Sequence, residues 1–196
     1  MVPGEAVGVR KFAAELGTSN GPIRDALLQL GNENLVEGGH GKAWKVTEIT
    51  PELVDEGMVV REALEVQCAR CCALSATPED IERLMKIAEQ IDARFDAGKI
   101  DEFPTELDER FHVMLAETAG HPRLREEIER WKVEMTWAQL SMGLSKANAW
   151  KGESHVKLVR AVATGDPDIA EKQMRQHIQH PWLDWKQETL GRDAAD

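Results

Sequence analysis

Apolar residues in the first 48 positions recur in short segments that are separated by glycines. Residues 9 to 16 (VRKFAAEL) have the spacing of a short helix that ends at Gly17. Residues 20 to 30 predict a second helix, with a serine before it and a proline in its first turn. After Gly31, the segments LVE and AWKVTE predict two short strands around the turn GGHGK. Two short helices and a hairpin are typical of a winged helix-turn-helix.

Long amphipathic segments follow, and no strand pattern appears after residue 48. Thr50-Pro51 opens a predicted helix of about 24 residues, and Thr77-Pro78 opens the next one. Four later helices are expected near residues 101–119, 122–144, 149–164 and 166–190. We therefore predict a mainly α chain in which an all-α six-helix bundle follows the winged helix-turn-helix. The expected boundaries are 1–48 for the first domain, 49–190 for the bundle and 191–196 for a disordered tail.

The net charge of −11 disfavours binding to nucleic acid, but the charge is uneven along the chain. The first 48 residues hold five Lys/Arg against six Asp/Glu, so nearly all of the acidic excess lies in the bundle. A polyanion would therefore have to bind the first domain.

Three cysteines, Cys68, Cys71 and Cys72, crowd one predicted helix. This spacing is a poor disulfide framework and indicates a reducing cytoplasm, with buried thiols favoured over a helical CxxC metal site. The first residues contain no signal-peptide core, and no apolar run is long enough for a membrane helix. We expect a cytoplasmic protein with no membrane partner.

The segment LDERFHVML places Asp108 and His112 four positions apart on a predicted helix, so both side chains lie on one face. Apolar neighbours mark that face as nearly the buried one, where unpaired polar groups are costly. His155 and His177 also fall on the apolar faces of their predicted helices. Each histidine alone would suggest a satisfied core residue. Imidazoles and a carboxylate from three helices of one bundle instead favour a Zn²⁺, Ni²⁺ or Fe²⁺ site.

Three segments together resemble the FadR-like branch of the GntR family of transcription regulators, whose ligand domain is of the FCD type. LDERFHVMLAETAGHPRL is similar to the D-x3-H signature of that domain. ESHVKLVRAVATGDPDIAEKQMRQHI is similar to its second signature, in which a second histidine follows the first by 22 residues. PGEAVGVRKFAAELGTSNGPIRDALLQLGNENLVEGGHGKAWKV looks like the family's winged helix.

The resemblance implies a metal site and a nearby acid site. Asp108, His112, His155 and His177 would be the ligands of a divalent ion, with zinc preferred over nickel or iron. Arg61 matches the arginine that the family places near the carboxylate of a small organic acid effector. Without the resemblance, an exposed ion pair with the glutamate at i+4 explains Arg61 equally well. His121 and His180 lie outside the motif.

The resemblance also implies contacts with an operator in double-stranded DNA. Arg24 would lie at the start of the recognition helix and Arg10 on the helix before it, while His40 and Lys42 would form the wing tip. Asn20 and Gly21 replace the Arg-Thr of many relatives, although Asn20 could read an adenine edge. The family's first helix, which covers the recognition helix, is expected to be missing here. A late start codon, a truncation and a degraded DNA-binding end all explain that departure.

We therefore predict a non-enzymatic, metabolite-responsive regulator that acts as a homodimer. Two rivals remain. A metalloenzyme could use the same ligands to activate water, although only Glu106 and Glu153 lie near the motif as bases. A metal-free helical scaffold with buried polar pairs is the other.

Overall fold

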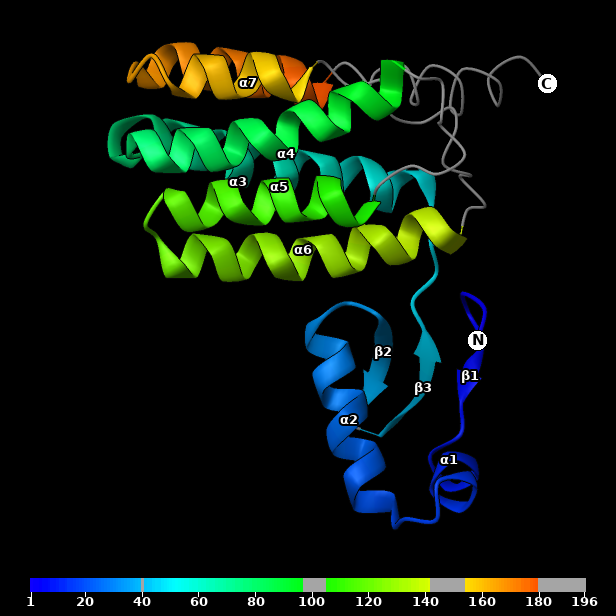
Figure 1. The fold of residues 1–196 in the computed structure, drawn as a ribbon. Helices are drawn as coiled ribbons and strands as arrows, with labels where there is room; N and C mark the ends of the chain where they lie inside the picture. The colour runs from blue at the N-terminus through cyan, green and yellow to red at the C-terminus, as the bar shows by residue number, and fades with distance from the viewer. Residues whose placement is uncertain (40, 97–104, 142–153, 180–196) are drawn as a thin grey trace, which may run out of the picture.

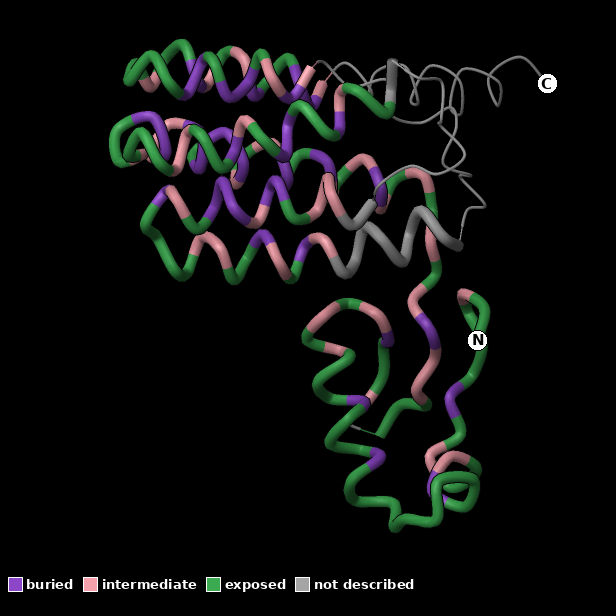
Figure 2. Tube along the Cα trace, in the orientation of Figure 1, coloured by how far each residue is buried: buried purple, intermediate pink, exposed green. Residues whose placement is uncertain are grey.

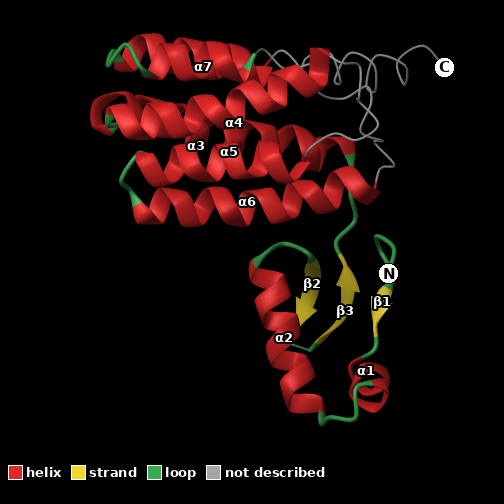
Figure 3. Ribbon diagram, viewed as in Figure 1, coloured by secondary structure: helices red, strands yellow, loops and turns green. Residues whose placement is uncertain are grey.

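The computed structural model describes residues 1–39, 41–96, 105–141 and 154–179. These residues form a small mixed domain, here called the head, and a larger helical domain that follows it (Figure 1). Figure 3 shows that every strand of the described residues lies in the head. The winged helix-turn-helix followed by helices is therefore confirmed as the fold class. Among the described residues, no helix is long and apolar enough to cross a membrane.

The head contains a three-stranded antiparallel sheet of order β1-β3-β2. Helices α1 and α2 pack on each other, and α2 also contacts β2. A small apolar core joins these elements, with Ile23 and Leu27 from α2 and Val36 and Val46 from the hairpin. The bounds of the elements are β1 Ala6–Val7, α1 Val9–Glu15, α2 Asn20–Asn32, β2 Val36–Gly39 and β3 Lys42–Val46.

Strand β1 was not predicted. It is only two residues long, and it is defined by pairing with β3, where Val7 lies opposite Trp44. A two-residue segment is too short to show the alternation on which a strand prediction rests. On the other side of β3, the hairpin is irregular between Glu37 and Gly39. Gly38 has a φ of +148°, and a Cβ there would lie 2.7 Å from the Ala43 carbonyl oxygen, so the hairpin needs glycine at this position.

The first two helices of the helical domain begin where the sequence pattern predicts. The Thr50 hydroxyl accepts a hydrogen bond from the Leu53 amide at 3.2 Å and caps the first helix. Thr77 and Asp80 cap the second in the same way, with an Asp80 amide to Thr77 Oγ1 distance of 3.2 Å. The helices are α3 Pro51–Ser75, α4 Pro78–Asp96, α5 Thr105–Thr118, α6 Pro122–Ser141, α7 His155–Val162 and a last helix at residues 167–179.

The predicted start of the fifth helix of this domain, near residue 149, is wrong. Helix α7 begins at His155, because Ser154 has non-helical backbone angles (φ −48°, ψ 127°) and its hydroxyl accepts a hydrogen bond from the Lys157 amide. The expected tail at 191–196 lies outside the described residues.

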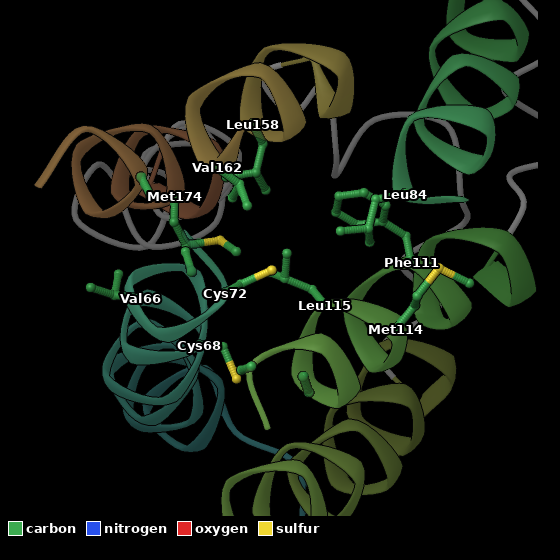
Figure 4. Close-up of a cluster of buried hydrophobic side chains, with 14 of the residues drawn as sticks. Val66, Cys68, Cys72, Leu84, Phe111, Met114, Leu115, Leu158, Val162 and Met174 are labelled. Carbon is green, nitrogen blue, oxygen red and sulfur yellow. The ribbon is translucent and has the colours of Figure 1, made fainter. Parts of the chain in front are cut away.

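The core of the helical domain takes buried residues from α3, α4, α5, α6, α7 and the last helix, and Figure 2 marks the buried positions along these helices. Figure 4 shows Phe111 and Leu115 of α5 meeting Leu84 of α4 and the sulfur of Cys72 on α3. Burial raises the pKa of the Cys72 thiol to about 12 and the pKa of Cys68 further still. Cys68 and Cys72 are therefore buried as predicted, whereas Cys71 is half-buried.

Candidate metal centre and DNA-binding surface

Three buried histidines meet inside the helical domain. His112 comes from α5, His155 from the first turn of α7 and His177 from the last helix, and each is at most 4% exposed. One nitrogen of each ring lies within 4.8 Å of one nitrogen of the other two. The 3.6-residue period of three separate helices thus brings together the three histidines that the sequence analysis singled out.

Asp108 lies one turn before His112 and reaches two of the three rings. Its Oδ1 is 2.9 Å from His155 Nε2 and 3.8 Å from His112 Nε2. Burial raises the pKa of Asp108, but His112, His155 and Arg61 outweigh burial and hold the pKa below its ordinary range. The fourth predicted ligand is therefore a carboxylate at the edge of the histidine cluster, with its side chain 24% exposed.

Two further carboxylates lie behind the rings, and the sequence analysis did not assign either to the site. Glu65 Oε2 of α3 is 2.6 Å from His112 Nδ1. Asp92 Oδ1 of α4 is 3.4 Å from His155 Nδ1, and its carboxylate also accepts hydrogen bonds from the backbone amides of His155 and Val156. Both contacts join residues far apart in sequence, so no local pattern could have revealed them.

Arg61 is buried at the same site rather than exposed on the surface of α3. Its Nε donates to Glu65 Oε1 at 3.2 Å, and its Nη2 lies 3.4 Å from His112 Nε2. The guanidinium carbon also lies 5.3 Å from the centre of the Trp131 ring of α6. The i+4 ion pair with Glu65 therefore exists, but it is buried beside the histidines, where a charged pair is costly unless it is well partnered.

The histidines differ in their protonation. Burial lowers the pKa of His112, and burial together with the charges of His155 and Arg61 lowers the pKa of His177 well below its ordinary value. Burial lowers the pKa of His155 too, but the contacts with Asp108 and Asp92 outweigh it and raise the pKa to about 8. At pH 7 the rings of His112 and His177 are therefore neutral and can bind a metal ion directly, whereas a metal ion would have to displace a proton from His155.

These shifts predict that metal-free protein is most stable slightly below pH 7. His112 and His177 bind protons more weakly in the folded than in the unfolded chain, so stability falls as pH drops below 6.5. His155 acts oppositely: its stabilisation is present below 6.5 and about 2 kcal/mol is lost as pH rises through 8. Urea unfolding in chelator between pH 5.5 and 8.5 tests this. A flat profile would contradict it, and His155→Gln should remove the loss at high pH.

Two of the predicted DNA contacts lie beside the same hollow of the head. Arg24 on α2 and Lys42 at the start of β3 are exposed and line the same open hollow of about 660 Å³. Asn20 at the start of α2 and Arg10 on α1 are exposed as well. His40 lies outside the described residues. Two of the five predicted contacts are thus brought together.

Comparison with known proteins agrees with this architecture. The family model described as "FCD domain" matches residues 56–180. The chain is 24% identical over 180 residues to the HTH-type transcriptional repressor RspR of Escherichia coli. The alignment covers 91% of this chain and 78% of the relative. It is 28% identical over 182 residues to an HTH-type transcriptional regulator of Streptomyces ambofaciens, with 91% and 75% covered.

Among solved structures, E. coli McbR/YncC superposes with a TM-score of 0.69 over 96% of this chain and 91% of that one, at 22% identity. This likeness extends the shared fold across the head as well as the helical domain. With the family model covering most of the chain, it follows that the protein belongs to the FCD-domain branch of the GntR family of DNA-binding transcriptional regulators.

Proposed function

We propose that this regulator binds an operator in DNA and that a small organic acid controls its affinity for that operator. The acid would bind at a divalent metal site in the helical domain. The observation that carries the proposal is the convergence of His112, His155 and His177, all buried, within 4.8 Å. A core seldom assembles three imidazoles unless they share a ligand, because each buried polar ring needs a partner.

The donor set fits a divalent transition metal. His112, His155 and His177 would supply imidazole nitrogens and Asp108 a carboxylate oxygen, a combination that suits zinc foremost, and nickel or iron as well. When bound, the ion would add positive charge and a coordination position that a carboxylate can take. Low pKa values keep His112 and His177 neutral, as metal ligands must be.

Arg61 is suited to hold the acid. Its guanidinium lies beside His112 and can present two parallel donors to a carboxylate, with Trp131 supporting its face. Lys132, the next residue along α6, is half-buried and its ammonium donates to the Glu109 carbonyl oxygen at 2.7 Å. Two cations near the histidines favour an anionic ligand over a neutral or cationic one.

Arg61 also offers a route from this site to the head. Trp131 Nε1 donates to the Gly57 carbonyl oxygen at 2.6 Å, and both residues line a cleft of about 700 Å³ that Trp44 and Gly38 line from the head. An acid that binds the Arg61 guanidinium and shifts it would therefore also shift the Trp131 ring, which lies at the interface between the domains. Coupling of this kind is typically about 1 to 3 kcal/mol.

In the head, Arg24 and Lys42 would contact phosphates and Asn20 a base edge. A homodimer would place two heads on a palindromic operator, and we expect the protein in the cytoplasm, where that DNA lies. The relatives are named as transcriptional regulators, which supports a binding role without catalysis.

The test is a DNA-binding titration of the full chain. Duplexes selected from a random pool by zinc-loaded protein are titrated with acetate, lactate, malonate and citrate. We expect at least one acid to change the apparent Kd by roughly 5- to 150-fold. Arg61→Gln should bind the same DNA and lose that response, whereas Arg83→Gln, an exposed arginine on α4, should keep it. Arg24→Ala should weaken DNA binding itself.

An operator affinity that none of these acids alters in zinc-loaded protein would refute control by the acid. Consumption of an acid, followed by NMR in the same samples, would instead support the metalloenzyme.

A further inference from the structure

The carboxylate of Glu65 lies between the arginine and a histidine of the proposed site. Its Oε1 accepts a hydrogen bond from Arg61 Nε at 3.2 Å, and its Oε2 lies 2.6 Å from His112 Nδ1. The side chain is 2% exposed, and within the described residues neither Oε2 nor Nδ1 makes a well-aligned hydrogen bond, so their 2.6 Å ion-pair contact is the closest polar contact that either buried atom has. Each of these two buried atoms therefore depends on the other.

Two contacts select the same tautomer of His112. Arg61 Nη2 can only donate, and it lies 3.4 Å from His112 Nε2, so the lone pair belongs on Nε2. The proton of the neutral ring is then on Nδ1, and Glu65 Oε2, 2.6 Å away, is the acceptor nearest to it. Burial raises the pKa of Glu65, but Arg61 and His112 outweigh it and keep the group an acceptor. The ring thus turns Nδ1 toward Glu65 and Nε2 toward Asp108 and the guanidinium of Arg61.

We propose that Glu65 is a positioning residue that fixes His112 with Nε2 directed into the metal site and holds Arg61 beside it. The inference rests on the proposed metal site, and it adds that one carboxylate sets both the metal affinity and the placement of the arginine. Outer partners of this kind orient ligand histidines and increase their basicity. At His155, Asp92 takes the equivalent place behind Nδ1.

Glu65→Gln tests the proposal because glutamine offers one acceptor and one donor group. Whichever way the amide turns, its NH2 faces either the Nδ1 proton of His112 or the Nε proton of Arg61. We expect the zinc affinity, measured by competition with a chromophoric chelator, to fall roughly 10- to 100-fold. Glu62→Gln is the matched control, since Glu62 lies on the same helix and bonds Arg175 and Gln179 instead. It should bind zinc as the wild type does.

A second measurement needs neither metal nor a variant. The imidazole nitrogen-15 shifts of His112 in metal-free wild-type protein should show Nδ1 protonated and Nε2 bare. The opposite tautomer, or wild-type zinc affinity in Glu65→Gln, would overturn the role of Glu65. Failure of the wild type itself to bind zinc would overturn the proposed metal site, and the nitrogen shifts would still decide whether Glu65 fixes the ring.

Discussion

Protein in which His155 and His177 are both replaced by alanine is expected to bind no metal, whereas the wild type purified without added metal holds roughly one equivalent. The change removes two of three converging imidazoles and leaves His112 and Asp108 on a single helix. Two ligands at i and i+4 cannot complete a four-coordinate site. Mass spectrometry of the purified proteins measures the metal content directly.

The same variant should lose the stabilisation that metal gives. Free zinc at about 1,000 times its Kd would stabilise the wild type by about 4 kcal/mol, and it should leave the variant unchanged. The comparison is made between chelator and zinc for each protein, so any direct cost of the two alanines cancels. His121→Ala is the control, because His121 is exposed between α5 and α6. Full metal content in the double variant would show that other residues are the ligands.

The inward position of the three histidines could be predicted from periodicity because each lies on a helix whose apolar stripe spans several turns. Leu158, Val159 and Val162 mark the buried face that His155 shares, and all three are at most 1% exposed. The helix starts at Thr50 and Thr77 could also be predicted, because capping is a local interaction. Local rules therefore recovered most of the fold and the three histidines.

The carboxylates behind the rings could not be predicted in the same way. Glu65 reads as the partner of Arg61 on an exposed face, and nothing in its surroundings in sequence indicates that α5 and α6 cover this face. Asp92 accepts a hydrogen bond from the amide of His155, which lies 63 residues away in the sequence. Such contacts depend on how helices pack, which a pattern along one helix does not contain. The carboxylates that orient the histidines are therefore identified only once the folded structure is known.

Phe111 supports the site from the apolar side. It is fully buried, and its ring meets the rings of His112 and His155 edge-on, with centroids 5.3 and 5.0 Å apart. Figure 4 shows it packed beside Leu84 and near Met114. One aromatic ring therefore belongs both to the core and to the wall of the histidine cluster, so its removal should act on both.

Phe111→Ala should lower the free energy of unfolding by about 3 to 5 kcal/mol, because it deletes a large buried side chain and leaves a cavity between α4 and α5. Urea unfolding in chelator measures this cost, and Leu74→Ala, at a position 71% exposed on α3, should change stability by less than about 0.5 kcal/mol. With the contacts of both rings lost, zinc should also stabilise the variant less than the wild type. A variant with the full core penalty but an undiminished response to zinc would show that Phe111 serves the core alone, and that the histidines are held in place by their polar partners.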